Sequence, residues 1–191
     1  MDLAVGCTYK YLNAGPGSPA FLYVSARLRD VLRQPIWGWF SQRDQFAMGP
    51  RYDPAAGIAK FTTGTPPILG VAAVEEGARL LLEAGIEQMR AKSMRLTAYL
   101  IELADAWLVP LGCAIATPRQ ASRRGGHVTF WHPEAGPIVA QLAAAGVITD
   151  FRTPERFRFG LSPLTTRFTD VWDAADAARD IITQKRYENH G

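Results

Sequence analysis

Residues 6–17 read GCTYKYLNAGPG and place Lys10 between Tyr9 and Tyr11, where a short apolar segment runs into a tight loop of glycine and proline. A lysine held between aromatic rings at such a junction can be desolvated, and desolvation favours the neutral, nucleophilic form of an amine. The alternative is a lysine whose aliphatic stem packs on the rings while its head stays in water. The spacing of the residues by itself favours this second interpretation.

The composition is that of a packed globular protein. The chain has 191 residues, 48% of them apolar and 20% charged, which fits one domain or a large domain fragment and argues against a disordered chain. An excess of 21 basic over 18 acidic residues is too small to indicate nucleic acid or a membrane surface as a partner. Cys7 and Cys113 do not make a disulfide framework, and the N-terminus lacks a signal-like segment. These features predict a reducing, cytoplasmic setting.

The segment from residue 1 to about 70 is rich in glycine, proline and aromatic residues, which breaks any periodic pattern. We expect short strands joined by shaped loops there, one of them at Phe21–Val24. This strand material is too little to close a sheet by itself, so it would need partners from elsewhere. Residues 69–107 then carry apolar side chains at three- and four-residue intervals, which predicts two helices or one long helix bent near Gly85.

The last part of the sequence alternates between strand-like and helix-like patterns. Strands are predicted at 112–117, 126–131 and 157–161, with 150–154 as the turn that leads into the third. Helices are predicted at 137–145 and 168–184. The buried face of the final helix is expected to hold Phe168, Val171, Trp172, Ala175, Ala178 and Ile182. The pattern is typical of a compact α+β domain against which the preceding helices pack.

Three common kinds of catalytic site find little support in the sequence. His127, His132, Cys7 and Cys113 lack the paired spacing of a metal site. The Gly15–Gly17 turn lacks the Lys-Ser/Thr pair of a phosphate-binding loop. A Ser-His-Asp site would need a nucleophile-elbow motif, which the sequence does not contain.

Five segments, in order along the chain, resemble the kynureninases, fold-type-I enzymes that depend on pyridoxal 5'-phosphate (PLP). They are Gly6–Gly17, Gly38–Phe40, Gly64–Ile68, Arg124–Val128 and Arg158–Leu164. The resemblance implies an α/β fold, the C-terminal portion of an aspartate-aminotransferase-like (type I) PLP fold. Residues 1–70 would be a remnant of the large cofactor-binding domain, and residues 71–191 a linking helix with an α+β small domain.

The resemblance also implies roles for individual residues. Lys10 matches the lysine that binds PLP covalently, and Tyr9 matches a tyrosine that binds the cofactor phosphate and takes part in proton transfer. Trp39 and Thr65 match positions that bind the cofactor phosphate across a dimer interface. Arg158 matches the arginine that pairs with the substrate's α-carboxylate. The donors suit these ligands, since phenol and indole groups hydrogen-bond phosphate and a guanidinium can hold a carboxylate with two bonds.

Three of these residues also have an ordinary structural interpretation. Trp39, beside Trp37, fits a core position, and Thr65, just before a proline, fits a turn. Arg158 alternates with two phenylalanines, so it faces away from them, and an outward arginine on a strand is usually just solvated. The sequence leaves both interpretations open for each residue.

The implied reaction is hydrolysis of the Cβ–Cγ bond of L-kynurenine, or of its 3-hydroxy form, to anthranilate or 3-hydroxyanthranilate and L-alanine. It belongs to tryptophan catabolism and pyridine nucleotide biosynthesis. Kynureninase subunits are much longer than this chain, so we expect the equivalent of their C-terminal half, acting as a homodimer or with an N-terminal half, without nucleic acid or membrane.

Two other functions stay open. One is a catalytically inert kynureninase fragment or a small-domain interaction module. The other is a basic binding protein that uses a set of arginines: Arg119, Arg123, Arg124, Arg152, Arg156 and Arg158. No interleaving of basic and aromatic residues typical of nucleic-acid binding supports that second function.

Overall fold

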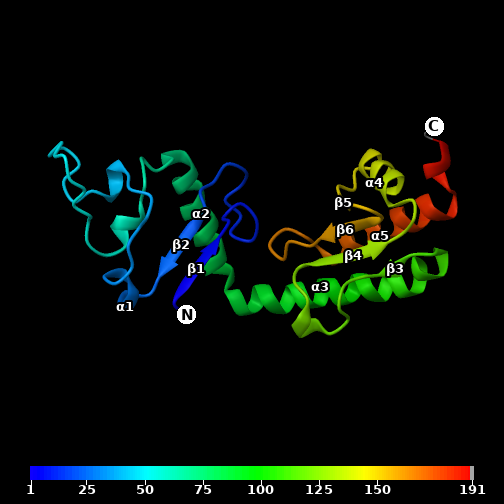
Figure 1. The fold of residues 1–191 in the computed structure, drawn as a ribbon. Coiled ribbons are helices and arrows are strands. Elements are labelled where there is room, and N and C mark those ends of the chain that lie inside the picture. Colours follow the sequence, from blue (N-terminus) through cyan, green and yellow to red (C-terminus); the bar gives the residue numbers. More distant parts are fainter. Residues whose placement is uncertain (190–191) are drawn as a thin grey trace. The chain divides into compact units, whose positions relative to one another are not determined.

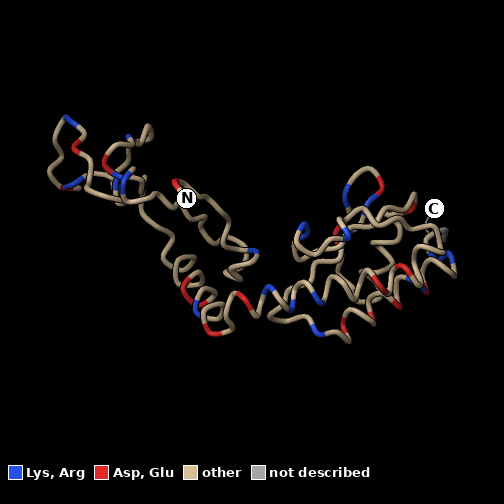
Figure 2. Tube along the Cα trace, turned by 90° about the horizontal axis from the view of Figure 1, so that it is seen from below, with Lys and Arg blue, Asp and Glu red and all other residues tan. Residues whose placement is uncertain are grey.

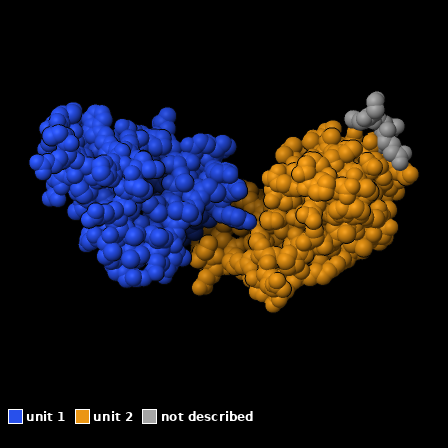
Figure 3. Space-filling model, in the orientation of Figure 1, with its two compact units in different colours: residues 1–83 blue, residues 84–191 orange. Residues whose placement is uncertain are grey.

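The structure is a computed structural model that describes residues 1–189. The chain divides into two compact units, unit 1 with residues 1–83 and unit 2 with the residues from 84 onward (Figures 1 and 3). The domain boundary expected after residue 70 falls inside helix α2 (Ile68–Ala84).

Unit 1 is built on a small sheet and shaped loops. Its elements are β1 (Leu3–Gly6), β2 (Phe21–Val24), α1 (Ala26–Arg29), two 3-10 turns at Trp39–Ser41 and Gly57–Phe61, and α2. β1 and β2 pair antiparallel, with Leu3 opposite Val24, and the strand predicted at 21–24 is confirmed. Val24 is buried, whereas Leu3 and Val5 are exposed. The pair therefore leaves apolar strand surface uncovered, as the sequence predicted.

Two helices occupy the long periodic segment. α2 ends at Ala84 and α3 (Ile86–Trp107) begins two residues later. Between them Gly85 has a φ of 78°, a left-handed conformation that glycine adopts without the steric cost of a Cβ atom. The two-helix alternative is confirmed, with its break at the predicted glycine.

Unit 2 contains a four-stranded antiparallel sheet. In spatial order its strands are β3 (Ala114–Ile115), β4 (His127–Trp131), β6 (Arg156–Gly160) and β5 (Asp150–Arg152). The three predicted strands are confirmed, although β3 is shorter than expected. The prediction of a turn at 150–154 is wrong for its first three residues, which pair with β6 as an edge strand. Three residues followed closely by Pro154 are too short to show a strand pattern in the sequence.

The core of unit 2 lies on one face of this sheet. The helices that contribute to it are α3, α4 (Ala135–Ala144) and α5 (Phe168–Thr183). Alternate strand residues point into it, namely Val128, Phe130, Phe157 and Phe159, all of them buried. The last helix buries most of its predicted face, but Trp172 is 44% exposed and contacts Trp107 instead. The same alternation turns the intervening strand residues toward the opposite face.

Charges of both signs are interspersed along the chain (Figure 2). Among the described helices, none is both long and apolar enough to cross a membrane. Four of the six arginines in the predicted basic set have partners within unit 2. Arg124 is buried, Arg119 pairs with Asp105 at 2.7 Å, and both Arg152 and Arg158 pair with Asp150.

Arg124 ties the loop before β4 to helix α3. Its Nε donates to Thr97 Oγ1 at 2.9 Å, and Nη1 donates to the carbonyl of Arg119. Arg90 adds a second tie from α3, donating to the carbonyl of Ala121 at 2.8 Å. Burial lowers the pKa of Arg124, and the neighbouring positive charge of Arg90 adds to this effect. The Arg124 side chain therefore has a structural role, which is to hold the loop before β4 against helix α3.

Arg124→Ala should lower the free energy of unfolding of unit 2 by about 2 kcal/mol, because hydrogen bonds to a charged group and its buried stem are lost together. The measurement is urea unfolding followed through the amide signals of β4 and β6. The neighbouring, exposed Arg123 gives the matched control, and Arg123→Ala should change the value by less than about 0.5 kcal/mol. Equal effects of the two substitutions on the free energy of unfolding would contradict this structural role of Arg124.

His132 is a buried histidine that the fold holds neutral. Its Nδ1 accepts the backbone N–H of Glu134 at 3.0 Å, a bond that a protonated ring cannot accept. Burial lowers the pKa of His132 below its usual value, and the nearby Glu134 carboxylate opposes this effect.

Stability should therefore depend on pH in the direction set by His132. The folded chain binds a proton at His132 less readily than the unfolded chain. The contribution of this histidine to stability is therefore fully present above about pH 6.5, and the free energy of unfolding falls as the pH drops below that value. Urea unfolding at about pH 7.5 and about pH 5.5 measures the fall. In His132→Gln, which keeps an acceptor for the Glu134 N–H, the fall should shrink; an unchanged fall would assign it to other groups.

Candidate functional site

Lys10 lies in a closed loop that follows β1. The loop is fixed by its own backbone, since the Asn13 N–H donates to the Lys10 carbonyl at 2.9 Å and the Ala14 N–H donates to the Thr8 carbonyl at 3.1 Å. The Thr8 hydroxyl, which is buried, reaches across to the carbonyl of Pro19 at 2.6 Å. These bonds give the lysine a defined backbone position at the surface of unit 1.

The side chain of Lys10 points outward from this loop. Its Nζ lies 5.4 Å from the centroid of the Tyr9 ring, and both residues are exposed. Within unit 1 the lysine is solvated, as in the second interpretation, although it is the amine rather than the aliphatic stem that lies over the aromatic ring. The amine is therefore accessible to an aldehyde from outside.

Helix α2 provides the seat for the lysine loop. A Cβ atom on Gly77 would stand 2.1 Å from the carbonyl oxygen of Leu12, far inside contact distance. Two turns earlier in the helix, a Cβ on Gly70 would lie 3.0 Å from the Cδ atom of Pro19. Gly70 and Gly77 are two turns apart on one helix face, so the backbone of the loop lies directly on the backbone of α2. No side chain other than hydrogen fits at Gly77.

A second close contact joins the segments that carry Trp39 and Thr65. A Cβ on Gly38 would lie 1.6 Å from the carbonyl oxygen of Thr63, so the residue before Trp39 touches the backbone two residues before Thr65. The sequence separates these positions by more than twenty residues, yet the structure brings them together. Both Trp39 and Thr65 are exposed. Their indole and hydroxyl donors are therefore accessible from solvent, on two segments that touch.

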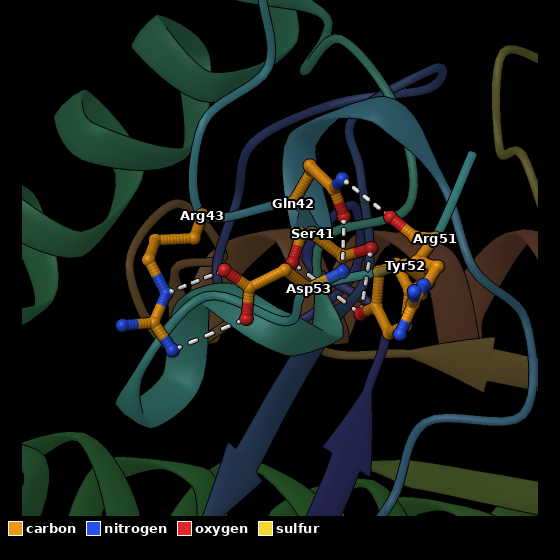
Figure 4. A network of polar contacts seen from close by, with 6 residues as sticks. All are labelled: Ser41, Gln42, Arg43, Arg51, Tyr52 and Asp53. Carbon is orange, nitrogen blue, oxygen red and sulfur yellow. Dashed lines mark hydrogen bonds and ion pairs between the residues drawn. The ribbon is translucent and has the colours of Figure 1, made fainter. Parts of the chain in front are cut away.

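A polar network holds the loop after Trp39 (Figure 4). Tyr52 donates from its hydroxyl to Ser41 Oγ at 3.0 Å, and Arg43 pairs with Asp53 at 3.0 Å. The ring of Tyr52 also stacks on Trp37, with centroids 4.7 Å apart. Together with Trp39 and Arg51 these rings line a cavity of about 620 Å³. Trp39 is thus at the edge of a cavity rather than in a core.

Arg158 lies in unit 2, at the middle of β6. Its neighbours Phe157 and Phe159 are buried, and the arginine points to the opposite face of the sheet, as the alternation predicts. It pairs there with Asp150 of β5, directly opposite in the register, through Nε at 2.9 Å and through Nη2. His127 of β4 is near enough for Arg158 to lower its pKa, an effect smaller than that of burial and opposed by Asp150.

Sequence reasoning missed Asp150, Gly38 and Gly77. Asp150 was hidden because its segment was interpreted as a turn, so no cross-strand partner could be assigned. Gly38 was interpreted only as part of a loop-forming segment and Gly77 was given no role, because nothing in the sequence says which backbone a glycine meets. Among residues 1–189, no cluster of three or more His, Cys, Asp or Glu side chains could hold a metal ion.

The donor set of unit 1 suits PLP. Lys10 offers a primary amine to the aldehyde, and Tyr9, Trp39 and Thr65 offer O–H and N–H donors to a phosphate. All four side chains are exposed, and the glycine contacts at Gly38 and Gly77 fix the backbones that carry them. The residues present therefore fit the group.

The fold is that of the fold-type-I PLP enzymes. An apo cysteine desulfurase from Thermococcus onnurineus superposes with a TM-score of 0.77 at 18% identity, over 96% of this chain and 47% of that one. An alanine–glyoxylate aminotransferase from Nostoc gives a TM-score of 0.66 at 20% identity, over 95% and 48%. The predicted fold class is confirmed.

Sequence comparison narrows this class to one family. Residues 89–178 match the kynureninase C-terminal domain. The chain is 45% identical to kynureninase of Pseudomonas fluorescens over 97% of its own length, and 44% identical to that of Burkholderia mallei over 95%. It spans 45% and 44% of the length of these relatives. The resemblance to kynureninases is confirmed, and residues 89–178 are the part that matches the kynureninase C-terminal domain.

Gly77→Ala should loosen the lysine loop. Alanine normally stabilises a helix by about 1 kcal/mol over glycine, but here the added Cβ meets a backbone oxygen, and such overpacking costs about 1–3 kcal/mol or more. Hydrogen exchange of the Asn13 and Ala14 amides, whose bonds close the loop, should speed up by at least about tenfold.

Gly49→Ala is the control for this substitution, because its Cβ would meet no atom within 4 Å. It should leave both exchange rates unchanged. An unchanged rate in Gly77→Ala as well would mean that the loop is not seated on α2.

Proposed function

We propose that this chain carries the lysine, the phosphate donors and the carboxylate-binding arginine of a PLP-dependent kynureninase. The reaction would be hydrolysis of the Cβ–Cγ bond of L-kynurenine or 3-hydroxykynurenine, which gives anthranilate or 3-hydroxyanthranilate and L-alanine. The observation that carries the proposal is the exposed Lys10 on a loop locked to α2, in a chain 45% identical to a kynureninase along 97% of its length.

Each residue has a defined task in this proposal. When bound, PLP supplies the electron sink for cleavage of the carbon–carbon bond. Lys10 would hold the cofactor covalently until the substrate amine displaces it, and its freed Nζ would then take up the proton from the substrate Cα. Tyr9 would donate a hydrogen bond from its Oη to the phosphate, and the same hydroxyl would deliver a proton to the substrate Cβ once the Cβ–Cγ bond has broken. Trp39 Nε1 and Thr65 Oγ1 donate to the phosphate of a second copy, and Arg158 binds the α-carboxylate.

The exposed surface of unit 1 supports an assembled form. Leu69 and Leu82 of α2 are 87% and 84% exposed, and apolar residues of β1 are exposed as well. An apolar surface of this kind normally marks an interface. We propose that the remaining part of a large cofactor domain covers it, on the same polypeptide or another, within a cytoplasmic homodimer.

The test uses the chain, PLP and borohydride, which fixes the cofactor on the lysine that has bound it. Peptide mass spectrometry should find Lys10 as the main site of attachment, with Lys60 of the same unit as the internal comparison. Lys10→Ala should abolish this product and leave labelling of Lys60 unchanged. Equal labelling of the two lysines would remove Lys10 from its proposed role.

Activity gives the second test. With an N-terminal half of a kynureninase added, the mixture should release anthranilate from L-kynurenine, and Lys10→Ala should slow this by about 10²-fold to 10⁴-fold. A mixture without activity, although Lys10 binds PLP, would favour the inert fragment. That alternative requires unit 2 to fold without the rest of an enzyme, and unit 2 buries an apolar core of its own.

A further inference from the structure

We propose that Asp150 is a positioning residue that orients the Arg158 guanidinium for end-on binding of a carboxylate. The inference rests on the proposed role of Arg158 and adds to it the residue that orients the arginine side chain. Its starting point is the direct pairing of the two residues across β5 and β6.

The contact between the two side chains has a specific geometry. Both donors of Arg158, Nε at 2.9 Å and Nη2, converge on the single oxygen Oδ2. The second oxygen, Oδ1, pairs with Arg152 Nη1 at 2.9 Å. One carboxylate thus links two guanidinium groups, and it grips Arg158 by its side edge.

This grip leaves the other edge of the guanidinium unengaged by Asp150. Nη1 and the second hydrogen of Nη2 form the end-on fork, whose two parallel N–H groups match the spacing of carboxylate oxygens. The Arg158 side chain is 31% exposed, so a ligand can reach it. The face that holds Arg158 is also fixed, because Phe157 and Phe159 occupy the core side of the strand.

The surroundings explain why Arg158 needs such a partner. Arg156, two residues away on β6, shares its face of the sheet, and Arg152 stands opposite Arg156. Three guanidinium groups on neighbouring positions repel one another. Without Asp150, the long side chain of Arg158 would turn into solvent and lose the orientation that two-point binding requires.

Asp150 could act in an opposite way, as a competitor whose negative charge repels an incoming carboxylate. Substitution distinguishes these two roles. Because both bonds from Arg158 end on one oxygen, the single side-chain oxygen of Asn can keep them while the charge is lost. Alanine removes the oxygen and the charge together. Positioning predicts that Asn preserves carboxylate affinity and Ala weakens it, whereas competition predicts that both strengthen it.

The experiment uses the full chain with ¹⁵N-labelled arginine, and follows the Nε–H signal of Arg158, assigned with Arg158→Ala, during titration with L-kynurenine. L-Kynurenine amide, which lacks the carboxylate, is the ligand control. Asp150→Asn should bind L-kynurenine as tightly as the unsubstituted chain or more tightly. Asp150→Ala should bind it about threefold to tenfold more weakly, the cost of ordering one free arginine side chain, with faster exchange of the Nε–H.

Asp105→Ala is the matched protein control, because it frees another arginine, Arg119 at 2.7 Å, from its aspartate in the same unit. It should leave the affinity unchanged. If the NMR signals of core residues show that Asp150→Ala is unfolded, Asp150→Ser replaces it. The serine hydroxyl is too short to hold Arg158, so this variant should also bind L-kynurenine more weakly.

The outcomes separate this inference from the proposed function. An Asp150→Ala variant that binds L-kynurenine as tightly as the unsubstituted chain, or more tightly, overturns the positioning role. Binding that persists in Arg158→Ala, or that is equal for the amide, instead overturns the role of Arg158 in the proposed function. In that case the Nε–H exchange of Arg158 still decides whether Asp150 holds the side chain, because it needs no ligand.

Discussion

The missing side chain at Gly77 is the constraint on which the candidate site depends. Because only hydrogen stands there, the backbone of the Leu12–Ala14 turn can rest on the backbone of α2. This turn closes through backbone bonds to Thr8 and Lys10, and the Thr8 hydroxyl adds a bond to the carbonyl of Pro19, so the loop is held without the lysine side chain. A site built in this way keeps its reactive side chain free, since no part of the amine is needed to hold the loop in place.

Unit 2 uses the reverse arrangement. There the apolar side chains of β4 and β6 are buried beneath three helices, and the alternation of the strands turns the polar residues to the other face. Arg158 is presented by this alternation, and its aim is set by an ion pair rather than by backbone packing. The two units thus position functional groups by different physics: close backbone contact in one, and strand geometry with charge in the other.

The sequence predicted the helices and strands whose apolar residues follow a regular spacing. α2, α3 and α5 follow from apolar spacing, and β4 and β6 from alternation with buried phenylalanines. β5 was not predicted, because three residues are too few to show an alternating pattern. Asp150, the partner of Arg158 on that strand, was therefore missed as well. The contacts of Gly38 and Gly77 escaped because a glycine shows where backbone freedom or room is needed but not what fills that room. The candidate residues themselves came from resemblance, since spacing alone favoured a solvated Lys10.

The two units also differ in how far each one satisfies itself. Unit 2 gathers its buried apolar side chains in one core, whereas unit 1 leaves Leu3 and Val5 of β1 and Leu69 and Leu82 of α2 exposed. The lysine loop follows β1 and rests on α2 at Gly77, so it belongs to the two elements that carry these exposed residues. A partner that covered the loop itself would desolvate Lys10. Assembly is thus the step that would turn the solvated lysine of unit 1 into the desolvated nucleophile that the proposed chemistry requires.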